Sequence, residues 1–229
     1  MTRIKICCIS SLEEALLALR SGATALGLVS EMPTGPGVID EGAIAQIVAQ
    51  LPPSADTFLL TSATDAPSII AQWRRCRPST LQLVDAVPFG DLKTLREALD
   101  GVKIVQVIHV VGPESIEEAV NVAPWVDAIL LDSGNPALRE LGGTGRAHDW
   151  SISARLRQAV DPVPVYLAGG LKASNAAAAM VQVKPYGLDI CSGVRTDGKL
   201  DADKLTAFIG AVRRQDADPE VDPGAPSSA

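Results

Sequence analysis

The chain has 229 residues, of which 47% are hydrophobic and 21% charged, and its formal net charge is −7. This composition lies far from that of disordered proteins, and the negative charge excludes a generic nucleic-acid binder, which would need a basic face. The longest apolar runs, such as 128–131, are much shorter than the ~20 residues that a membrane-spanning helix needs. The sequence therefore predicts a folded protein that has no membrane span.

The amino terminus and the cysteines bear on the cellular compartment. The first residues enter an alternating apolar pattern directly and do not resemble a secretory signal, so we expect a cytoplasmic protein. The four cysteines form no Cys-x-x-Cys pair, which argues against disulfides and against a zinc site.

Short strands and amphipathic helices alternate along the chain. Strands are predicted at 3–8, 25–29, 57–60, 80–83, 103–109, 128–131, 163–168 and 188–191. Helices are predicted at 41–51, 66–75, 91–99, 113–122, 149–160, 173–183 and 201–214, after a first helix that ends near Gly22. Ser11 and Glu14 have the spacing of a capping box at the start of that first helix.

Eight strand-helix units without an internal linker indicate one closed (β/α)8 barrel, an α/β fold with eight parallel strands. The barrel domain is expected to span 1–214, and an open doubly wound sheet is the structural alternative. Residues 215–229 are rich in proline and acidic residues and contain no Lys or Arg, which is typical of a disordered tail. That division leaves 20 basic and 23 acidic residues in the barrel, a net charge of −3.

In such a barrel the reacting groups lie at the carboxyl ends of the strands. Two glycine-containing turns, Gly169-Gly170 and Ser192-Gly193, follow the last two predicted strands. Glycines let backbone amides approach an anion closely, and barrels commonly bind phosphate in these two loops. The turns therefore predict a phosphorylated small-molecule ligand, with simple tight turns as the alternative.

Two further residues at strand ends are candidates for proton transfer. Asp132 ends a buried run, where partial desolvation suits acid-base work, although its carboxylate could instead cap the turn at 133–135. Cys7 could accept a proton if its thiolate is stabilised, or it could be a small buried apolar residue. His109 also follows a strand, where a structural role is more common.

Six short motifs along the chain carry a family resemblance. They are K-I-C-C-I-S at 5–10, L-L-D-S at 130–133, G-G-T-G at 142–145 with Asp149-Trp150, L-A-G-G-L at 167–171 with Asn175, P-Y-G-L-D at 185–189 and S-G-V at 192–194. In this order they resemble the motifs of the phosphoribosylanthranilate isomerases, barrel enzymes of tryptophan biosynthesis. The resemblance runs from Lys5 to about Arg214.

The resemblance implies an Amadori rearrangement of N-(5-phosphoribosyl)anthranilate. Asp132 would then be the general acid at the ring oxygen, and Cys7 would take the proton from the sugar C2. The amides around Gly169, Gly170, Ser192 and Gly193 would hold the phosphate. This chemistry needs no metal and no organic cofactor, and its partner is a phosphorylated small molecule rather than nucleic acid or a membrane. Monomer and homodimer both remain open.

The sequence departs from the family pattern near the barrel mouth. Gly37 stands where the family has an Arg that faces the anthranilate carboxylate, Asp85 adds a carboxylate after Gln82 and Val84, and Arg195 replaces a common Glu. Cys8 replaces a Gly, and Cys191 replaces a Ser. Losing one charged hydrogen-bonding partner weakens binding by about 1.5–3 kcal/mol.

Gln82, Asp85, Gly37 and Arg195 are therefore expected in the substrate pocket, and two interpretations follow. In the first, the protein is an isomerase in which Arg195, Arg139 or Arg146 binds the carboxylate. In the second, it acts on, or only binds, a different phosphorylated sugar or amine.

Overall fold

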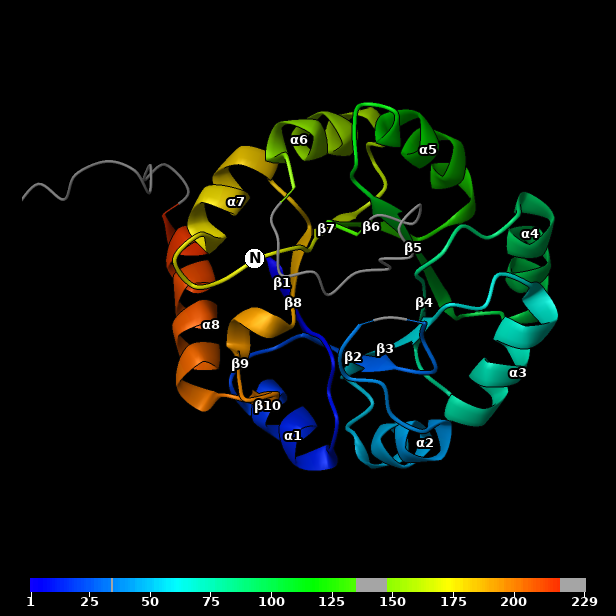
Figure 1. Ribbon diagram of the computed structural model, residues 1–229, viewed down its shortest axis with the longest axis horizontal. Helices are drawn as coiled ribbons and strands as arrows, with labels where there is room; N and C mark the ends of the chain where they lie inside the picture. Colours follow the sequence, from blue (N-terminus) through cyan, green and yellow to red (C-terminus); the bar gives the residue numbers. More distant parts are fainter. Residues whose placement is uncertain (34, 135–147, 219–229) are drawn as a thin grey trace, which may run out of the picture.

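The computed structural model describes residues 1–33, 35–134 and 148–218, and within them eight parallel strands close into a barrel (Figure 1). The strands are β1 (Arg3–Ile6), β2 (Ala25–Val29), β3 (Asp56–Thr61), β4 (Thr80–Leu83), β5 (Lys103–His109), β6 (Ala128–Asp132), β7 (Val165–Leu167) and β8 (Gly187–Ile190). Each strand pairs with the next in chain order, and β1 pairs with β8 at Ile4 and Leu188 to close the ring. The predicted barrel is confirmed, and the open sheet is excluded.

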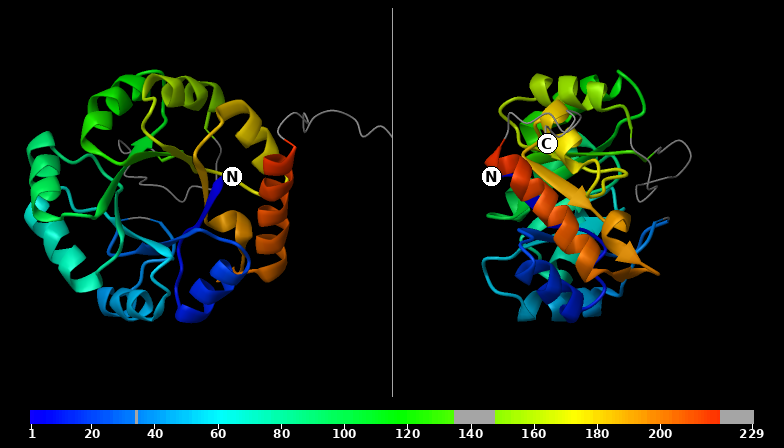
Figure 2. Two further views of the ribbon diagram at one scale, coloured as in Figure 1. Left: turned by 180° about the vertical axis from the view of Figure 1, so that it is seen from behind. Right: turned by 90° about the vertical axis from the view of Figure 1, so that its left-hand side faces the viewer.

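Helices surround the barrel as an outer ring (Figure 2). They are α1 (Leu12–Arg20), α2 (Glu41–Gln50), α3 (Ala66–Cys76), α4 (Phe89–Ala98), α5 (Ser115–Val122), α6 (Trp150–Ala159), α7 (Ala176–Val183) and α8 (Ala202–Ala217), with short 3-10 turns η1 (Ala123–Trp125) and η3 (Ser192–Val194). The Ser11 side chain accepts a hydrogen bond from the Glu14 amide, as the capping box predicts. The Glu14 carboxylate reaches back to the amide of Ser10 rather than of Ser11. No helix in the described ranges is long and apolar enough to cross a membrane.

The strand residues divide between two layers because successive side chains point to opposite faces. Ile4, Leu26 and Leu59 belong to the apolar layer between the barrel and its helices. The interior layer is partly polar, since Lys5 and Asp189 are buried there as an ion pair, with 2.8 Å between Nζ and Oδ2. A fully buried lysine is rare unless it is paired.

Three local features differ from the sequence expectations. Strand β1 ends at Ile6, and Cys8 has a left-handed backbone with φ of +63°. A hairpin of β9 (Arg195–Thr196) and β10 (Lys199–Leu200) follows η3, and no sequence pattern predicted it. Helix α8 continues to Ala217, three residues beyond its expected end at Arg214, and residues 219–229 lie outside the described residues.

The extended helix has a reason in tertiary contacts. The Asp216 carboxylate accepts hydrogen bonds from the backbone amide and hydroxyl of Thr2, and it pairs with Arg213. Asp216 therefore belongs to the barrel and to its charge balance rather than to the tail.

Candidate active site

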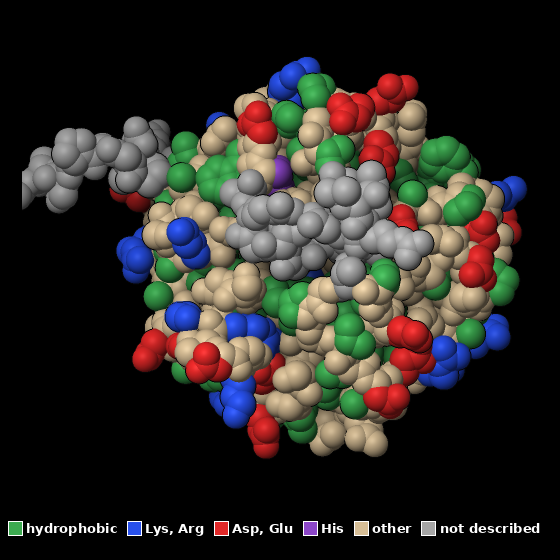
Figure 3. All heavy atoms as spheres, in the orientation of Figure 1, with side chains coloured by type: hydrophobic (Ala, Val, Ile, Leu, Met, Phe, Trp, Pro, Cys, Tyr) green, Lys and Arg blue, Asp and Glu red, His purple; other side chains and the backbone are tan. Residues whose placement is uncertain are grey.

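A cavity of about 740 Å³, part of which is open to solvent, lies at the carboxyl ends of the strands. Its described lining comes from most of the barrel and includes Cys7, Cys8, Val29, Met32, Leu60, Gln82, Val84, Asp132, Gly169, Gly170, Asp189, Cys191 and Ser192. Around the face seen in Figure 3, acidic and basic side chains are interspersed. The cavity is the natural place for chemistry in a parallel barrel.

Cys7, directly after β1, and Asp132, at the end of β6, both line this one cavity. Cys7 is buried, and its backbone amide donates to the Ile190 carbonyl at 2.8 Å, which joins the end of β1 to β8. The Asp132 Oδ1 accepts a hydrogen bond from the amide of Ser133 at 2.7 Å, and the same residue lines the cavity. A backbone contact and a position in the cavity occur together, so the two sequence interpretations of Asp132 do not exclude one another. His109 is buried with Nε2 2.9 Å from the Val84 carbonyl, a structural contact.

The glycine turns after β7 and β8 lie beside one another. Gly169 and Gly170 have left-handed backbones and line the cavity together with Ser192. Gly193 is absent from the described lining of the cavity. It lies against the loop after β7, since a Cβ atom at this position would be 2.1 Å from the Leu171 carbonyl oxygen. Gly193 thus lets the two loops touch. Asn175 donates to the Gly170 carbonyl and fixes the first turn.

Of the four residues expected in the substrate pocket, one is in the described lining of the cavity and three are not. Gln82 lines the cavity, and its buried Oε1 has no hydrogen-bond partner among the described residues. Asp85 is outside the described lining, and its carboxylate accepts a hydrogen bond from the neighbouring Ala86 amide. Gly37 is outside it as well, since it packs against Cys8.

Arg195 is the third of these residues outside the described lining. Its side chain is only 8% exposed and is paired with Glu14. Among the described residues, the lining of the cavity contains no lysine or arginine. Arg139, Arg146 and the motif at 142–145 lie outside the described residues.

Three thiols gather at the cavity, a feature that sequence reasoning missed. Cys7, Cys8 and Cys191 all line it, although the third is far from the others in the chain. A hydrogen bond from the Cys8 thiol lowers the pKa of Cys191, against burial and with help from the nearby Arg195 charge. The same hydrogen bond, together with the contact to Cys7 and burial, raises the pKa of Cys8.

The buried Lys5-Asp189 pair was missed as well. Burial acts to lower the pKa of Lys5, but the Asp189 carboxylate and the nearby Cys7 thiol outweigh it and leave that pKa raised. Asp189 lines the cavity, and its Oδ1 has no hydrogen-bond partner among the described residues. The sequence signal for this pair was one charged residue at an inward-facing position of β1 and one of β8, and it can be recognised only once the strand register is known. In the described part of the chain, no three or more His, Cys, Asp or Glu side chains are placed to hold a metal ion.

A closed barrel with a carboxyl group and a thiol in one cavity at its carboxyl-terminal mouth defines a (β/α)8-barrel enzyme. The family model described as N-(5'phosphoribosyl)anthranilate (PRA) isomerase matches residues 4–211. The chain therefore belongs to the N-(5'-phosphoribosyl)anthranilate isomerase family, which confirms the resemblance seen in its motifs.

Individual relatives and solved structures agree. The N-(5'-phosphoribosyl)anthranilate isomerase of Methanocella arvoryzae is 35% identical, with 93% of this chain and 99% of the relative covered. That of Afipia carboxidovorans is 37% identical, with 94% and 91% covered. The crystal structure of phosphoribosyl anthranilate isomerase from Thermotoga maritima matches with a TM-score of 0.81 at 28% identity, covering 93% of this chain and 100% of that one. A phosphoribosyl anthranilate isomerase in complex with reduced 1-(o-carboxyphenylamino)-1-deoxyribulose 5-phosphate matches at a TM-score of 0.78 and 26% identity, with the same coverage.

Proposed function

We propose that this protein catalyses the Amadori rearrangement of N-(5'-phosphoribosyl)anthranilate in tryptophan biosynthesis. The observation that carries the proposal is that Cys7, directly after β1, and Asp132, at the end of β6, line the same cavity in a chain of this family. The relatives' names and the ligand of the solved complex support the same substrate. No observation favours a different phosphorylated sugar or amine.

The proposed reaction uses one acid and one base. Asp132 protonates the furanose ring oxygen, the bond from that oxygen to C1 breaks, and the nitrogen lone pair forms an iminium ion with C1. The Cys7 thiolate then removes the proton from C2, and the C–H electrons form a C1–C2 double bond while the nitrogen regains its lone pair. The resulting enol rearranges to the aminodeoxyketose, so atoms and electrons balance without a cofactor.

The cavity offers different surroundings to the two ends of the substrate. Gly169, Gly170 and Ser192 line one part, where exposed amides favour a phosphate group. Another part is lined by apolar side chains that suit a flat aromatic ring: Val29, Met32, Leu60 and Val84. This arrangement supports binding of a phosphosugar that carries an aromatic amine.

Complementation and turnover test the proposal. The gene should restore growth without tryptophan to an auxotroph that lacks only this isomerase. The purified protein should consume the fluorescence of phosphoribosylanthranilate, and Cys7→Ala and Asp132→Ala should each abolish that turnover. Lack of turnover by the folded wild-type protein at high substrate concentration would refute the proposal.

Assembly, location and domain division are further parts of the proposal. The dimeric enzyme of Thermotoga maritima, of which a monomeric form matches at 25% identity, supports a homodimer over a monomer, and light scattering tests this. The cytoplasmic location is tested by cell fractionation. The division into one barrel domain and a carboxyl-terminal tail is tested by limited proteolysis, which should stop near the end of α8.

A further inference from the structure

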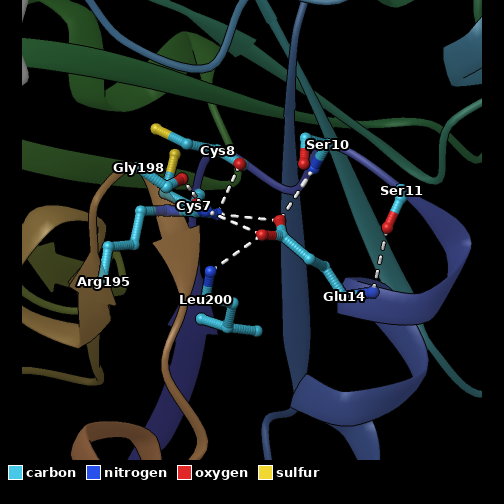
Figure 4. A network of polar contacts seen from close by, with 8 residues as sticks. All are labelled: Cys7, Cys8, Ser10, Ser11, Glu14, Arg195, Gly198 and Leu200. Carbon is cyan, nitrogen blue, oxygen red and sulfur yellow. Dashed lines mark hydrogen bonds and ion pairs between the residues drawn. The ribbon is translucent and has the colours of Figure 1, made fainter.

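Arg195 holds the backbone that carries Cys7, although it lies outside the described lining of the cavity. Its Nη2 donates to the carbonyl oxygen of Cys8, with a second, longer contact of 3.3 Å to that of Cys7 (Figure 4). Its Nη1 donates to the Gly198 carbonyl at 2.9 Å. A guanidinium can serve several acceptors at once because its donors form a rigid, planar fork.

Glu14 completes this arrangement from the first turn of α1. Its carboxylate accepts from Arg195 at 2.9 and 3.1 Å, from the Leu200 amide at 2.8 Å and from the Ser10 amide at 3.0 Å. Burial acts to raise the pKa of Glu14, but the hydrogen bonds from Arg195, Leu200 and Ser10 outweigh it and leave that pKa lowered. The charged pair therefore ties the β9-β10 hairpin to the turn between β1 and α1.

That turn needs external support. Cys8 has a left-handed backbone, which is disfavoured for a residue with a Cβ atom. Such a conformation persists only where the surroundings hold it. The two carbonyls that Arg195 binds belong to Cys8 itself and to the residue before it, Cys7.

We propose that Arg195 is a positioning residue for the reaction: by holding the carbonyls of Cys7 and Cys8, it fixes the Cys7 thiol in line with the sugar carbon. This inference rests on the proposed function, and it assigns Arg195 a role other than binding the substrate carboxylate. A misplacement of about 1 Å in a reacting group can lower a rate about 100-fold, so the expected loss is in kcat.

Arg213 provides a matched control at the opposite end of the barrel. It is also partly buried, and its Nη1 donates to one backbone carbonyl, that of Thr2, and to one carboxylate, that of Asp216, at 2.7 and 2.9 Å. Removing the Arg213 side chain should lower stability, as removal of the Arg195 side chain does. The backbone that Arg213 contacts, however, precedes β1, whereas the backbone that Arg195 contacts follows β1. Arg213→Gln is therefore expected to keep kcat.

The experiment compares Arg195→Gln, Arg195→Lys and Arg213→Gln at a temperature well below each melting point. For Arg195→Gln we expect kcat to fall about 10- to 100-fold with KM little changed. Arg195→Lys keeps the charge but not the fork, so its kcat should be intermediate. As a readout that needs no turnover, the pH dependence of Cys7 alkylation by iodoacetamide, resolved from Cys8 by tandem mass spectrometry, should change in both Arg195 variants and not in Arg213→Gln.

The outcomes separate this inference from the proposed function. Unchanged kcat and unchanged Cys7 alkylation in folded Arg195→Gln would show that Arg195 only stabilises the fold. A raised KM with unchanged kcat would assign it to substrate binding instead. If Arg195→Gln does not fold, Arg195→Lys decides on the same readouts. If the wild type shows no turnover, the proposed function fails while the alkylation comparison still tests the positioning.

Discussion

The side chain of Cys8 occupies the space in which a side chain at Gly37 would begin. A Cβ atom built on Gly37 lies 2.4 Å from the Cys8 Cβ, a separation that real Cβ atoms essentially never show, and Gly37 has φ of +82°. The two departures from the family pattern, Cys8 for Gly and Gly37 for Arg, are therefore sterically coupled. Gly37 therefore cannot be reverted to Arg without also removing the Cys8 side chain.

Reverting Gly37 alone should fail. Gly37→Arg combines an overlap with Cys8 and a left-handed backbone, so we expect the free energy of unfolding to fall by about 1–3 kcal/mol or more. Its KM for phosphoribosylanthranilate should not improve. Urea denaturation and steady-state kinetics measure the two effects.

Reverting both positions should succeed where the single change fails. In Cys8→Gly with Gly37→Arg the 2.4 Å overlap with the Cys8 Cβ is removed, while a tight 3.0 Å contact with the Cα at position 8 and the left-handed backbone at position 37 remain. An arginine beside the cavity then restores a cation for the carboxylate. We expect KM to fall by about tenfold, which corresponds to about 1.4 kcal/mol. Cys8→Gly alone is the control and should leave KM close to that of the wild type. An equal gain in Gly37→Arg alone would refute the coupling.

The two roles of Asp132 can be separated by one isosteric change. Asp132→Asn keeps an oxygen that accepts from the Ser133 amide but cannot serve as the acid at the ring oxygen. The melting temperature should therefore stay within a few degrees while kcat falls by about 100-fold or more, the scale of general acid catalysis. Unchanged kcat in Asp132→Asn, together with loss of stability in Asp132→Ala, would instead favour a purely structural role.

Acid should weaken the contact between α1 and the β9-β10 hairpin. The pKa of Glu14 is lowered in the folded protein, so its contribution to stability is complete above the unfolded value near 4.5 and is lost as the pH falls through the folded value. Glu14→Gln should therefore lose less stability than the wild type between neutral pH and acid. Glu13→Gln, on the same helical turn but exposed, should follow the wild type. Parallel pH curves for all three proteins would contradict the expectation.

Phosphate binding can be tested through the contact between the last two loops. Inorganic phosphate at high millimolar concentration should raise the melting temperature, because a ligand that binds only the folded state stabilises it. Gly193→Ala should reduce this shift, since the added methyl group meets the Leu171 carbonyl and forces the loops apart. Gly90→Ala is the matched control, because a Cβ atom there meets nothing within 4 Å. A full phosphate shift in Gly193→Ala would place the anion elsewhere.

The barrel was predictable because its information is local. Eight alternations of strand and helix, the capping box at Ser11 and the absence of a linker are patterns within short windows, and the structure confirms the order of every element they predict. The short sequence motifs also identified the protein family. Element ends were less certain, as the extension of α8 to Ala217 shows, because tertiary contacts such as that of Thr2 with Asp216 decide them.

The surroundings of the site were not predictable in the same way. Arg195 and Glu14 are 181 residues apart, so no local pattern reveals that their charges meet. The family resemblance placed Arg195 in the pocket because it stands where the family commonly has a Glu, whereas the direction of its side chain depends on a hairpin that was not predicted. Cys8 and Gly37 are a second example. A side chain at position 37 is excluded by the side chain of Cys8, which belongs to a different loop, and no local sequence pattern reveals this contact.

The seam between β1 and β8 has a consequence for how the protein is made. The bond from Lys5 to Asp189 joins residues 184 apart, and the Cys7 amide completes its pairing only with the Ile190 carbonyl. During synthesis β1 leaves the ribosome first and β8 leaves it near the end. For most of translation the strand that pairs with the backbone of Cys7 is therefore absent. Nascent chains that stop before β8 should therefore carry an accessible Cys7, and a complete site should form only once β8 has joined β1.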